Sequence, residues 1–232
     1  MKKIIRQLTS ILTLSVFVIT LTNSCKKDEQ KIIPKTITDI DGNVYHTIII
    51  GTQVWLTENL KVKHFRNGDS IPNITIETQW NNLQTGGYCD YNNNPTNSIT
   101  YGRLYNWFAV NGTRKITPIG WHIPTEAEWT VLIDYLGGDS IAGGSLKDTG
   151  FIHWNKPNTG ATNVSGFTGL AGGYHDYLNG LEYVDIGNYG YWWSSTMISP
   201  FGRICYIKND ESIIWRRYGD VNNAYAVRCI MD

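Results

Sequence analysis

The sequence has no excess of basic residues, and this absence excludes a large class of partners. It holds 20 Lys and Arg against 20 Asp and Glu, and charged residues make up only 17% of the chain. Proteins that bind nucleic acid carry clustered Lys and Arg, because contacts with phosphates supply much of their affinity. No basic block or stripe is present here, so we expect no nucleic-acid partner.

The sequence also lacks an apolar run long enough to span a bilayer. The apolar run over residues 8–21 has 14 residues, whereas a transmembrane helix needs about 20. Three basic residues precede this run and Cys25 follows it, which is the order typical of a secretory signal peptide. We predict that residues 1–24 are a signal peptide. Their removal would take away three basic and no acidic residues, leaving a mature net charge of −3.

Cys25 lies where the apolar segment gives way to charged residues. This placement resembles a bacterial lipoprotein signal, in which the thiol is lipidated and becomes the new N-terminus. The charged residues 26–30 resemble the export signals of surface lipoproteins from Bacteroidetes. The alternative is an ordinary cysteine after a conventional cleavage site, followed by a solvated spacer. We predict a lipidated Cys25 and a charged tether over residues 25–36, which anchor the protein by lipid at the outer membrane or cell surface.

Only three cysteines follow Cys25, at positions 89, 205 and 229. An exported protein meets an oxidising compartment, so one disulfide and one odd thiol are expected. Any of the three pairings is open. We favour Cys205 with Cys229, because both lie in segments that resemble C-terminal strands. The spacing of the three cysteines fits no zinc site, and we predict no metal ligands.

The motifs of the common enzyme classes are missing. The five histidines are scattered without an HxH or HExxH pair, and no G-x-S-x-G appears. No glycine run follows a strand and opens a helix, as phosphate binding requires. We therefore predict a protein that is not an enzyme, with no catalytic residues and no cofactor.

Aromatic residues and glycine are abundant instead. The chain has nine Trp, 14 Tyr and 23 Gly, a composition typical of a loop-rich extracellular fold. Such rings suit sugar binding, although most aromatic side chains serve a core. Residues 37–232 contain no Pro- or Ser-rich linker, so we predict that they form one domain with a single core.

The first part of this domain, residues 37–60, is predicted to form strands. Residues 37–60 alternate β-branched runs with turn residues, and Asp41 with Gly42 predicts a hairpin. A calcium loop over the same residues is excluded. Val44 stands where such a loop needs glycine, and Ile50 stands where it needs a bidentate glutamate.

Two segments predict helices. Residues 100–110 carry apolar residues at near-helical spacing. Residues 120–138 give a stronger signal, because Thr125 and Glu128 form a capping box. The apolar residues that follow lie on one helical face, namely Trp129, Leu132, Ile133 and Leu136.

The C-terminal third predicts an antiparallel sheet. Asn179 with Gly180 gives a second hairpin signal. Residues 188–196 predict a strand that places Trp192 and Trp193 on opposite faces. The remaining strands of this sheet are expected in ICYIKND, SIIWRRYGD and YAVRCI.

Five motifs occur in a fixed order along the chain: YGRLYNWFAV at 101–110, GWHIPTEAEW at 120–129, SGFTGLAGGY at 165–174, YWWSST at 191–196 and YAVRC at 225–229. Together they resemble the Fibrobacter succinogenes major paralogous domain, a family of secreted or lipid-anchored bacterial proteins. The resemblance covers about residues 38–231. This chain departs from the family at Thr117, where a cysteine is often found before the Pro-x-Gly-Trp-His segment.

The PTEAEW segment also resembles the formylglycine-generating enzymes, whose fold is a variant of the C-type lectin fold. This resemblance implies an α+β architecture in which short helices pack on twisted antiparallel sheets with long loops. It does not imply catalysis here. Those enzymes use two closely spaced reactive cysteines, whereas Cys205 and Cys229 are 24 positions apart.

These observations favour a non-enzymatic surface module that binds a glycan or a protein. The alternatives are an oxidoreductase related to the formylglycine-generating enzymes and a structural component of envelope assembly. Candidate ligand contacts are residues in Gly- and Asn-rich segments that we expect to be exposed, namely Trp154, Tyr174, His175, Asp176, Tyr177 and Tyr189.

Overall fold

The computed structural model describes residues 32–177 and 182–232. The chain divides after Ile32, and the second unit, Ile33–Asp232, is compact. The predicted signal peptide, Cys25 and residues 25–31 of the predicted tether lie outside the described residues. Among the described residues, no helix combines the length and apolar composition needed to cross a membrane.

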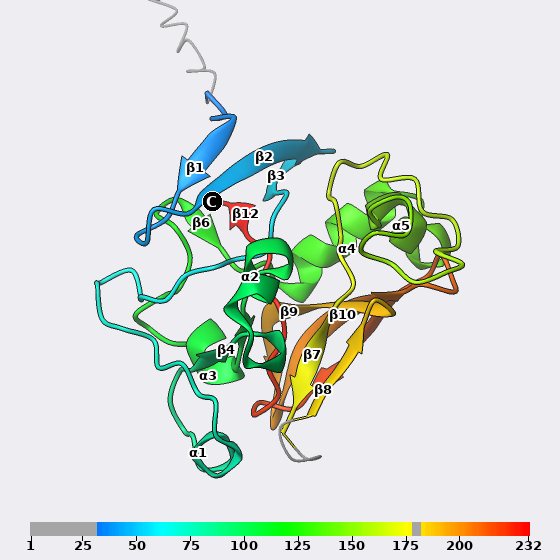
Figure 1. Ribbon diagram of the computed structural model, residues 1–232. Helices are drawn as coiled ribbons and strands as arrows, with labels where there is room; N and C mark the ends of the chain where they lie inside the picture. Colours follow the sequence, from blue (N-terminus) through cyan, green and yellow to red (C-terminus); the bar gives the residue numbers. More distant parts are fainter. Residues whose placement is uncertain (1–31, 178–181) are drawn as a thin grey trace, which may run out of the picture. The chain divides into compact units, whose positions relative to one another are not determined.

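The second unit is a mixed α+β structure dominated by strands (Figure 1). Its first sheet has the order β1-β2-β3-β12-β6, and each pair of neighbours is antiparallel. The predicted strands of residues 37–60 are confirmed, with the turn at Asp41 and Gly42 between β1 and β2. These five strands are β1 (Thr36–Thr38), β2 (Val44–Ile50), β3 (Gln53–Leu56), β6 (Trp121–His122) and β12 (Ile230–Met231).

The second sheet has the order β11-β10-β9-β7-β8. Its neighbours are antiparallel except β7 and β9, which run parallel. The strands are β7 (Gly172–Asp176), β8 (Glu182–Ile186), β9 (Tyr189–Ile198), β10 (Phe201–Lys208) and β11 (Ile214–Gly219). β7 and β8 form the predicted hairpin, whose turn at Asn179 and Gly180 lies outside the described residues.

Short helices and a two-stranded sheet connect these layers. The helices are α1 (Glu77–Asn81), α2 (Pro95–Tyr101), α3 (Trp107–Val110), α4 (Glu126–Tyr135), α5 (Asp139–Leu146) and the 3₁₀ helix η1 (Tyr91–Asn93), and the small sheet pairs β4 (Tyr88–Cys89) with β5 (Leu104–Tyr105). The predicted helix at 120–138 is confirmed as α4, with both bonds of its capping box formed. The helix predicted over 100–110 is wrong. Gly102, at φ 78°, ends α2, and the Asn106 side chain caps a separate α3.

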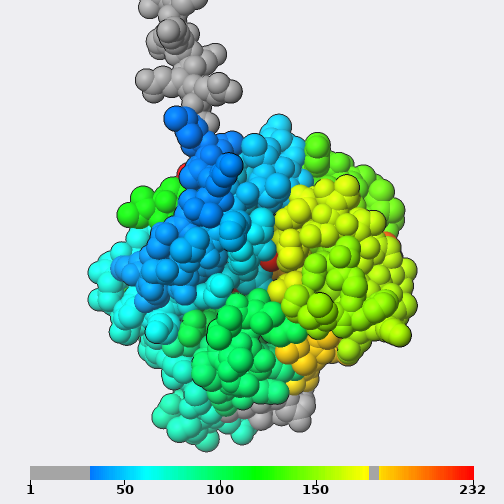
Figure 2. All heavy atoms as spheres, turned by 45° about the horizontal axis from the view of Figure 1, so that its top comes forward, coloured from blue at the N-terminus to red at the C-terminus, as the bar shows by residue number. Residues whose placement is uncertain are grey.

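The face drawn in Figure 2 is formed mainly by the first strands, the region of α2 and the long loop that follows α5. Only a small part of the second sheet, in orange, reaches this face. Most of the second sheet is therefore seen only in Figure 1, where β7 to β10 lie below α4 and α5.

Two hydrophobic clusters fill the interior. Trp192 belongs to the first and Trp193 to the second, which confirms that these neighbours occupy opposite faces of β9. Their indole N–H groups donate to Asn59 Oδ1 at 2.8 Å and to the carbonyl of Tyr105 at 2.7 Å. The YWW motif therefore connects the second sheet to segments far away in the sequence.

The YAVRCI segment does not join the second sheet as predicted. Only its last residue enters a strand, and that strand, β12, lies between β3 and β6 in the first sheet. The residues before β12 run between the sheets. The backbone N–H of Trp193 donates to the carbonyl of Ala226, and the backbone N–H of Leu60 donates to the carbonyl of Val227.

The predicted Cys205–Cys229 disulfide is wrong. The three cysteines in the described residues are all buried free thiols. Cys205 lies on β10 within the first cluster, whereas Cys229 precedes β12 within the second. Cys205 lies in the second sheet, whereas Cys229 leads into a strand of the first sheet, so no ladder brings them together.

Candidate functional site

Four aromatic side chains form a row across one face of the second sheet. They are Tyr174 on β7, Tyr191 on β9, Tyr206 on β10 and Trp215 on β11. Tyr206 lies opposite both Tyr191 and Trp215 in the antiparallel ladders. Neighbouring ring centroids are 4.9, 5.3 and 6.3 Å apart along the row. We call these four residues the aromatic row.

The spacing of the aromatic row follows from the sheet itself. Neighbouring strands lie about 4.8 Å apart, so side chains at matching positions on successive strands stand at nearly that distance. β7 joins the row through the parallel pairing of Gly173 with Gly190, which sets Tyr174 beside Tyr191. Three strand spacings make the row about 14 Å long.

The aromatic row lies where the second cluster opens to solvent. All four rings are half-buried. On one side the fully covered rings of Trp193 and Tyr225 continue the same face, and Tyr225 stacks on Tyr174 at 5.0 Å. On the other side Tyr189 stacks parallel to Tyr191 at 5.5 Å and is also half-buried. The row is thus supported from within and accessible from outside.

Carboxylates orient two of the hydroxyls in the row. Tyr191 donates to Asp185 Oδ2 at 2.8 Å, and Tyr174 donates to Asp176 Oδ2 at 3.4 Å. Burial and the adjacent carboxylates raise the pKa of Tyr174 to about 12, so its hydroxyl stays protonated at neutral pH. This end of the row therefore presents hydrogen-bonding groups held in place by acidic side chains.

Two cations and one carboxylate lie at the opposite end of the row, where Glu211 is ion-paired with Lys208 and accepts a hydrogen bond from the indole N–H of Trp215. The Nζ atom of Lys208 is 5.5 Å from the ring centre of Trp215 and 5.8 Å from that of Tyr189. The guanidinium carbon of Arg217 is 4.7 Å from the ring centre of Trp215, and Arg217 is exposed. Such cation–π contacts stabilise a side chain without using up its hydrogen-bond donors.

The family model described as the Fibrobacter succinogenes major domain matches residues 48–231. The chain belongs to this family. No match was found among curated proteins or among solved structures. The match covers every strand and helix from β3 to β12, including the whole aromatic row.

The motifs that carry the family resemblance form structural contacts in this Fibrobacter succinogenes major domain. Arg228 of YAVRC is buried, and its guanidinium donates to Asn59 Oδ1 and to the carbonyls of Leu56, Thr57 and Phe167. His122 of the GWHIPTEAEW segment lies between two carboxylates, 2.8 Å from Glu128 and 2.6 Å from Asp232. Both ring nitrogens are therefore engaged, and the imidazole joins α4 to the C-terminus.

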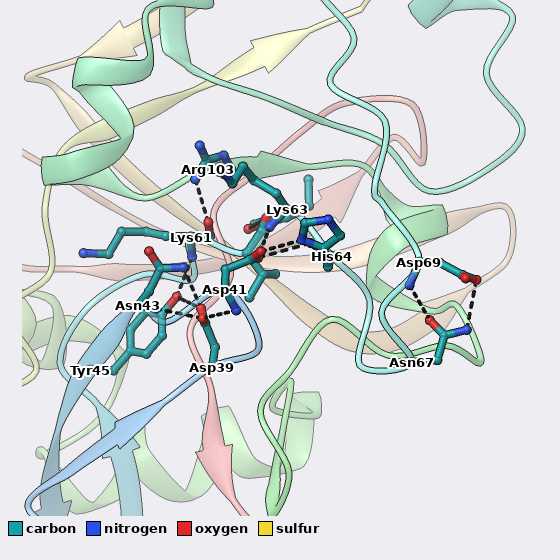
Figure 3. Close-up of polar contacts among 12 residues, drawn as sticks. Asp39, Asp41, Asn43, Tyr45, Lys61, Lys63, His64, Asn67, Asp69 and Arg103 are labelled. Atoms are coloured by element: carbon teal, nitrogen blue, oxygen red, sulfur yellow. Dashed lines mark hydrogen bonds and ion pairs between the residues drawn. The ribbon is translucent and has the colours of Figure 1, made fainter.

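A polar cluster at the turn after β1 is also structural (Figure 3). Asp39 accepts hydrogen bonds from the backbone and side-chain N–H groups of Asn43 at 2.9 and 2.8 Å. Asp41 accepts from the backbone of Lys63 and from His64. Burial acts in the opposite direction, but these hydrogen bonds prevail and lower the pKa of Asp41. The carboxylates of Asp39 and Asp41 therefore hold this turn against the segment at Lys63 and His64.

Across residues 32–177 and 182–232, no group of three or more His, Cys, Asp or Glu is arranged to hold a metal ion. The described part of the domain thus offers no metal centre on which to base a function.

Two predicted ligand contacts are not exposed as we expected. Trp154 is 1% exposed and donates its indole N–H to the carbonyl of Gly169 at 3.0 Å. His175 is fully buried between the rings of Trp80 and Tyr183. The Gly-rich neighbourhood of these residues suggested exposure, but the loop and β7 turn both side chains inward.

The other four predicted contacts are half-buried. Tyr174 belongs to the aromatic row, and Tyr189 and Asp176 contact its members. Tyr177 packs against the first cluster, with its backbone N–H bonded to Asn223.

Sequence reasoning missed three members of the aromatic row, namely Tyr191, Tyr206 and Trp215. A local pattern exists for two of them, Tyr191 and Tyr206. Buried and half-buried residues alternate at Gly190 to Trp192 and again at Cys205 to Ile207, with tyrosine at each half-buried position. Strand pairing is needed to show that these positions share one face.

Proposed function

We propose that this protein is a lipid-anchored binding module of the cell envelope whose aromatic row binds a glycan. The observation that carries the proposal is the row itself, with four half-buried rings on four neighbouring strands of one sheet. Core aromatic side chains normally become fully covered, and this domain covers six of its tryptophans in that way.

The geometry of the row suits an extended ligand. Sugar rings present apolar C–H faces that pack on aromatic rings, and their hydroxyls need hydrogen-bonding partners at the edges. The tyrosine hydroxyls and the carboxylates of Asp176 and Asp185 supply such partners. A row about 14 Å long accommodates several sugar units of a chain laid across the strands.

The state of the cysteines supports binding over oxidoreductase chemistry. A reactive cysteine needs an accessible thiolate. Cys205 and Cys229 are buried, and burial raises the pKa of both thiols. We also propose that the finer architecture is that of the C-type lectin and formylglycine-generating enzyme group, because short helices and long loops pack on antiparallel sheets.

The test is a binding screen of the purified protein against soluble neutral and acidic polysaccharides, followed by tyrosine nitration with and without the polysaccharide that binds. We expect the ligand to protect Tyr189, Tyr191 and Tyr206 from nitration. Tyr135, which is 64% exposed on α4, should stay equally reactive and serves as the control. Binding that protects Tyr135 but leaves the row reactive would contradict the proposed site.

The lipid anchor has a separate test. Cells expressing the chain are grown with labelled palmitate, and membrane fractions are compared for the natural sequence and for Cys25→Ala. We expect label and membrane retention only in the natural sequence. Equal labelling of both chains would contradict lipidation at Cys25.

A further inference from the structure

An exposed arginine at one end of the aromatic row indicates which class of glycan the row binds. Lys208 and Arg217 both lie against Trp215, at the edge strand β11. The acidic side chains Asp176 and Asp185 contact Tyr174 and Tyr191 at the other end. The two ends of the row therefore differ, with Arg217 beside Trp215 and two carboxylates beside Tyr174 and Tyr191.

Arg217 differs from the other arginines of this sheet in its partners. Arg203 is paired with Glu126, and Arg216 lies 2.7 Å from Asp139. Within the described residues, Arg217 has no carboxylate at ion-pair distance, and its one hydrogen bond is a 3.5 Å contact with the carbonyl of Arg216. Lys208, in contrast, is 3.1 Å from Glu211. Arg217 thus keeps most of its donors available beside the row.

The position of Arg217 suits it to recognise an anion. In the antiparallel ladder Arg217 pairs with Ile204, so its side chain lies on the same face of the sheet as the aromatic row. Ile204 is buried, whereas Arg217 is exposed. Packing against Trp215 restrains the guanidinium plane. A restrained guanidinium with free N–H groups binds a carboxylate through two parallel hydrogen bonds.

We propose that the aromatic row binds an acidic glycan, with the carboxylate of a uronic acid unit on Arg217 and a neutral or hydroxyl-rich part over Tyr174 and Tyr191. This inference rests on the proposed glycan-binding function and assigns the ligand class. Lys208 at the same end is ion-paired with Glu211, so Arg217 supplies the uncompensated positive charge there. The carboxylates at the far end disfavour an acidic unit over Tyr174 and Tyr191.

The test compares oligogalacturonates with their methyl esters, in which each carboxylate charge is replaced by an uncharged ester group on the same sugar chain. Binding of each oligosaccharide to the full protein is measured by calorimetry at low salt and at 0.5 M salt. We expect the free acid to bind at least about tenfold more tightly than the ester, because a hydrogen-bonded charge pair contributes about that much. The preference should shrink at high salt.

Substitutions of arginine test whether Arg217 causes the preference for the acidic oligosaccharide. Arg217→Gln should remove the preference for the acid, because it weakens binding of the acid much more than binding of the ester. Arg217→Lys should retain part of the preference, because the charge remains but the paired hydrogen bonds are lost. Arg114→Gln removes one arginine charge from the loop after α3 and should preserve the preference in full.

The outcomes separate this inference from the function on which it rests. Equal affinity for acid and ester, or a preference that survives in Arg217→Gln, would overturn the acidic-glycan assignment. Binding of neutral glycans alone would also overturn it, while leaving the proposed function intact. Failure of every neutral and acidic glycan to bind the folded protein would overturn both.

Discussion

The two faces of the second sheet are built from the same strands but differ in what covers them. On one face Trp192, Cys205, Ile207 and Ile214 are no more than 2% exposed, and they belong to the cluster that includes residues of α4 and α5. On the other face the aromatic row remains half-buried. The second cluster covers Trp193 and Ile204 on that face, so only the rings of the row, which lie beyond this cover, are available for binding.

The comparison shows how one strand can serve stability and recognition at once. In β9 and β10 adjacent residues alternate between the two faces, so a substitution at one position affects stability and a substitution at its neighbour affects binding. The predictions below test this division from the largest expected effect to the smallest.

The largest effect is expected on the covered face. Trp192→Ala should lower the free energy of unfolding by about 3–5 kcal/mol, because it removes a fully buried ring and leaves Asn59 without its indole donor. Urea unfolding followed by circular dichroism measures this change. A loss below about 1 kcal/mol would show that this face is not the main packing surface.

The pH dependence of stability tests the burial of His175 on β7. His175 is fully buried, whereas its neighbour Tyr174 belongs to the half-buried aromatic row. Burial lowers the pKa of His175 to about 4, so the unfolded chain binds a proton below pH 6.5 that the folded protein binds only near pH 4. Stability should therefore fall as pH decreases from 6.5 to 4, by about 3 kcal/mol from this residue. Denaturant unfolding at several pH values measures the slope.

The control for this effect is His175→Phe, which keeps an aromatic ring between Trp80 and Tyr183. The variant should lose most of the histidine-dependent slope between pH 6.5 and pH 4. An unchanged slope would mean that other groups, and not His175, destabilise the protein in acid.

A smaller effect is expected from the helix that covers the inner face. Thr125→Ala removes the hydroxyl that caps α4 and should cost about 1 kcal/mol in unfolding free energy. Thr125→Ser, which retains the hydroxyl, should cost much less. Neither change should alter glycan affinity, since α4 packs against the face opposite the aromatic row. A tenfold loss of affinity in Thr125→Ala would contradict the independence of the two faces.

Much of the fold followed from local sequence signals. The capping box and apolar stripe of α4 lie within twelve residues, from Thr125 to Leu136, and the turn at Asp41 and Gly42 needs only its flanking strands. Helix α5 was missed because its sequence contains Gly143 and Gly144. A Cβ atom at either position would lie within 2.6 Å of a backbone oxygen of another segment, at Ile213 or Gly160. That close approach is a tertiary requirement, which the local helical pattern does not reveal.

The site depended even more on tertiary pairing. Among these strands only β9 alternates aromatic residues, at Tyr189, Tyr191 and Trp193. The row exists only because β7 pairs in parallel with β9 and β10 pairs with both β9 and β11. The disulfide prediction failed for the same reason. Strand-like sequence around Cys205 and Cys229 does not say that one strand lies in each sheet.

The most direct measurement of the central claim compares Trp215→Ala with Tyr218→Ala in binding to the glycan that the screen identifies. Both residues lie on β11, but Trp215 belongs to the aromatic row, whereas Tyr218, 58% exposed, lies opposite Arg203 and contacts Phe201. We predict at least about a tenfold loss of affinity for Trp215→Ala and less than a twofold change for Tyr218→Ala. Each variant should lose no more than about 1 kcal/mol of stability. Equal effects of the two substitutions on affinity would contradict the aromatic row as the binding surface.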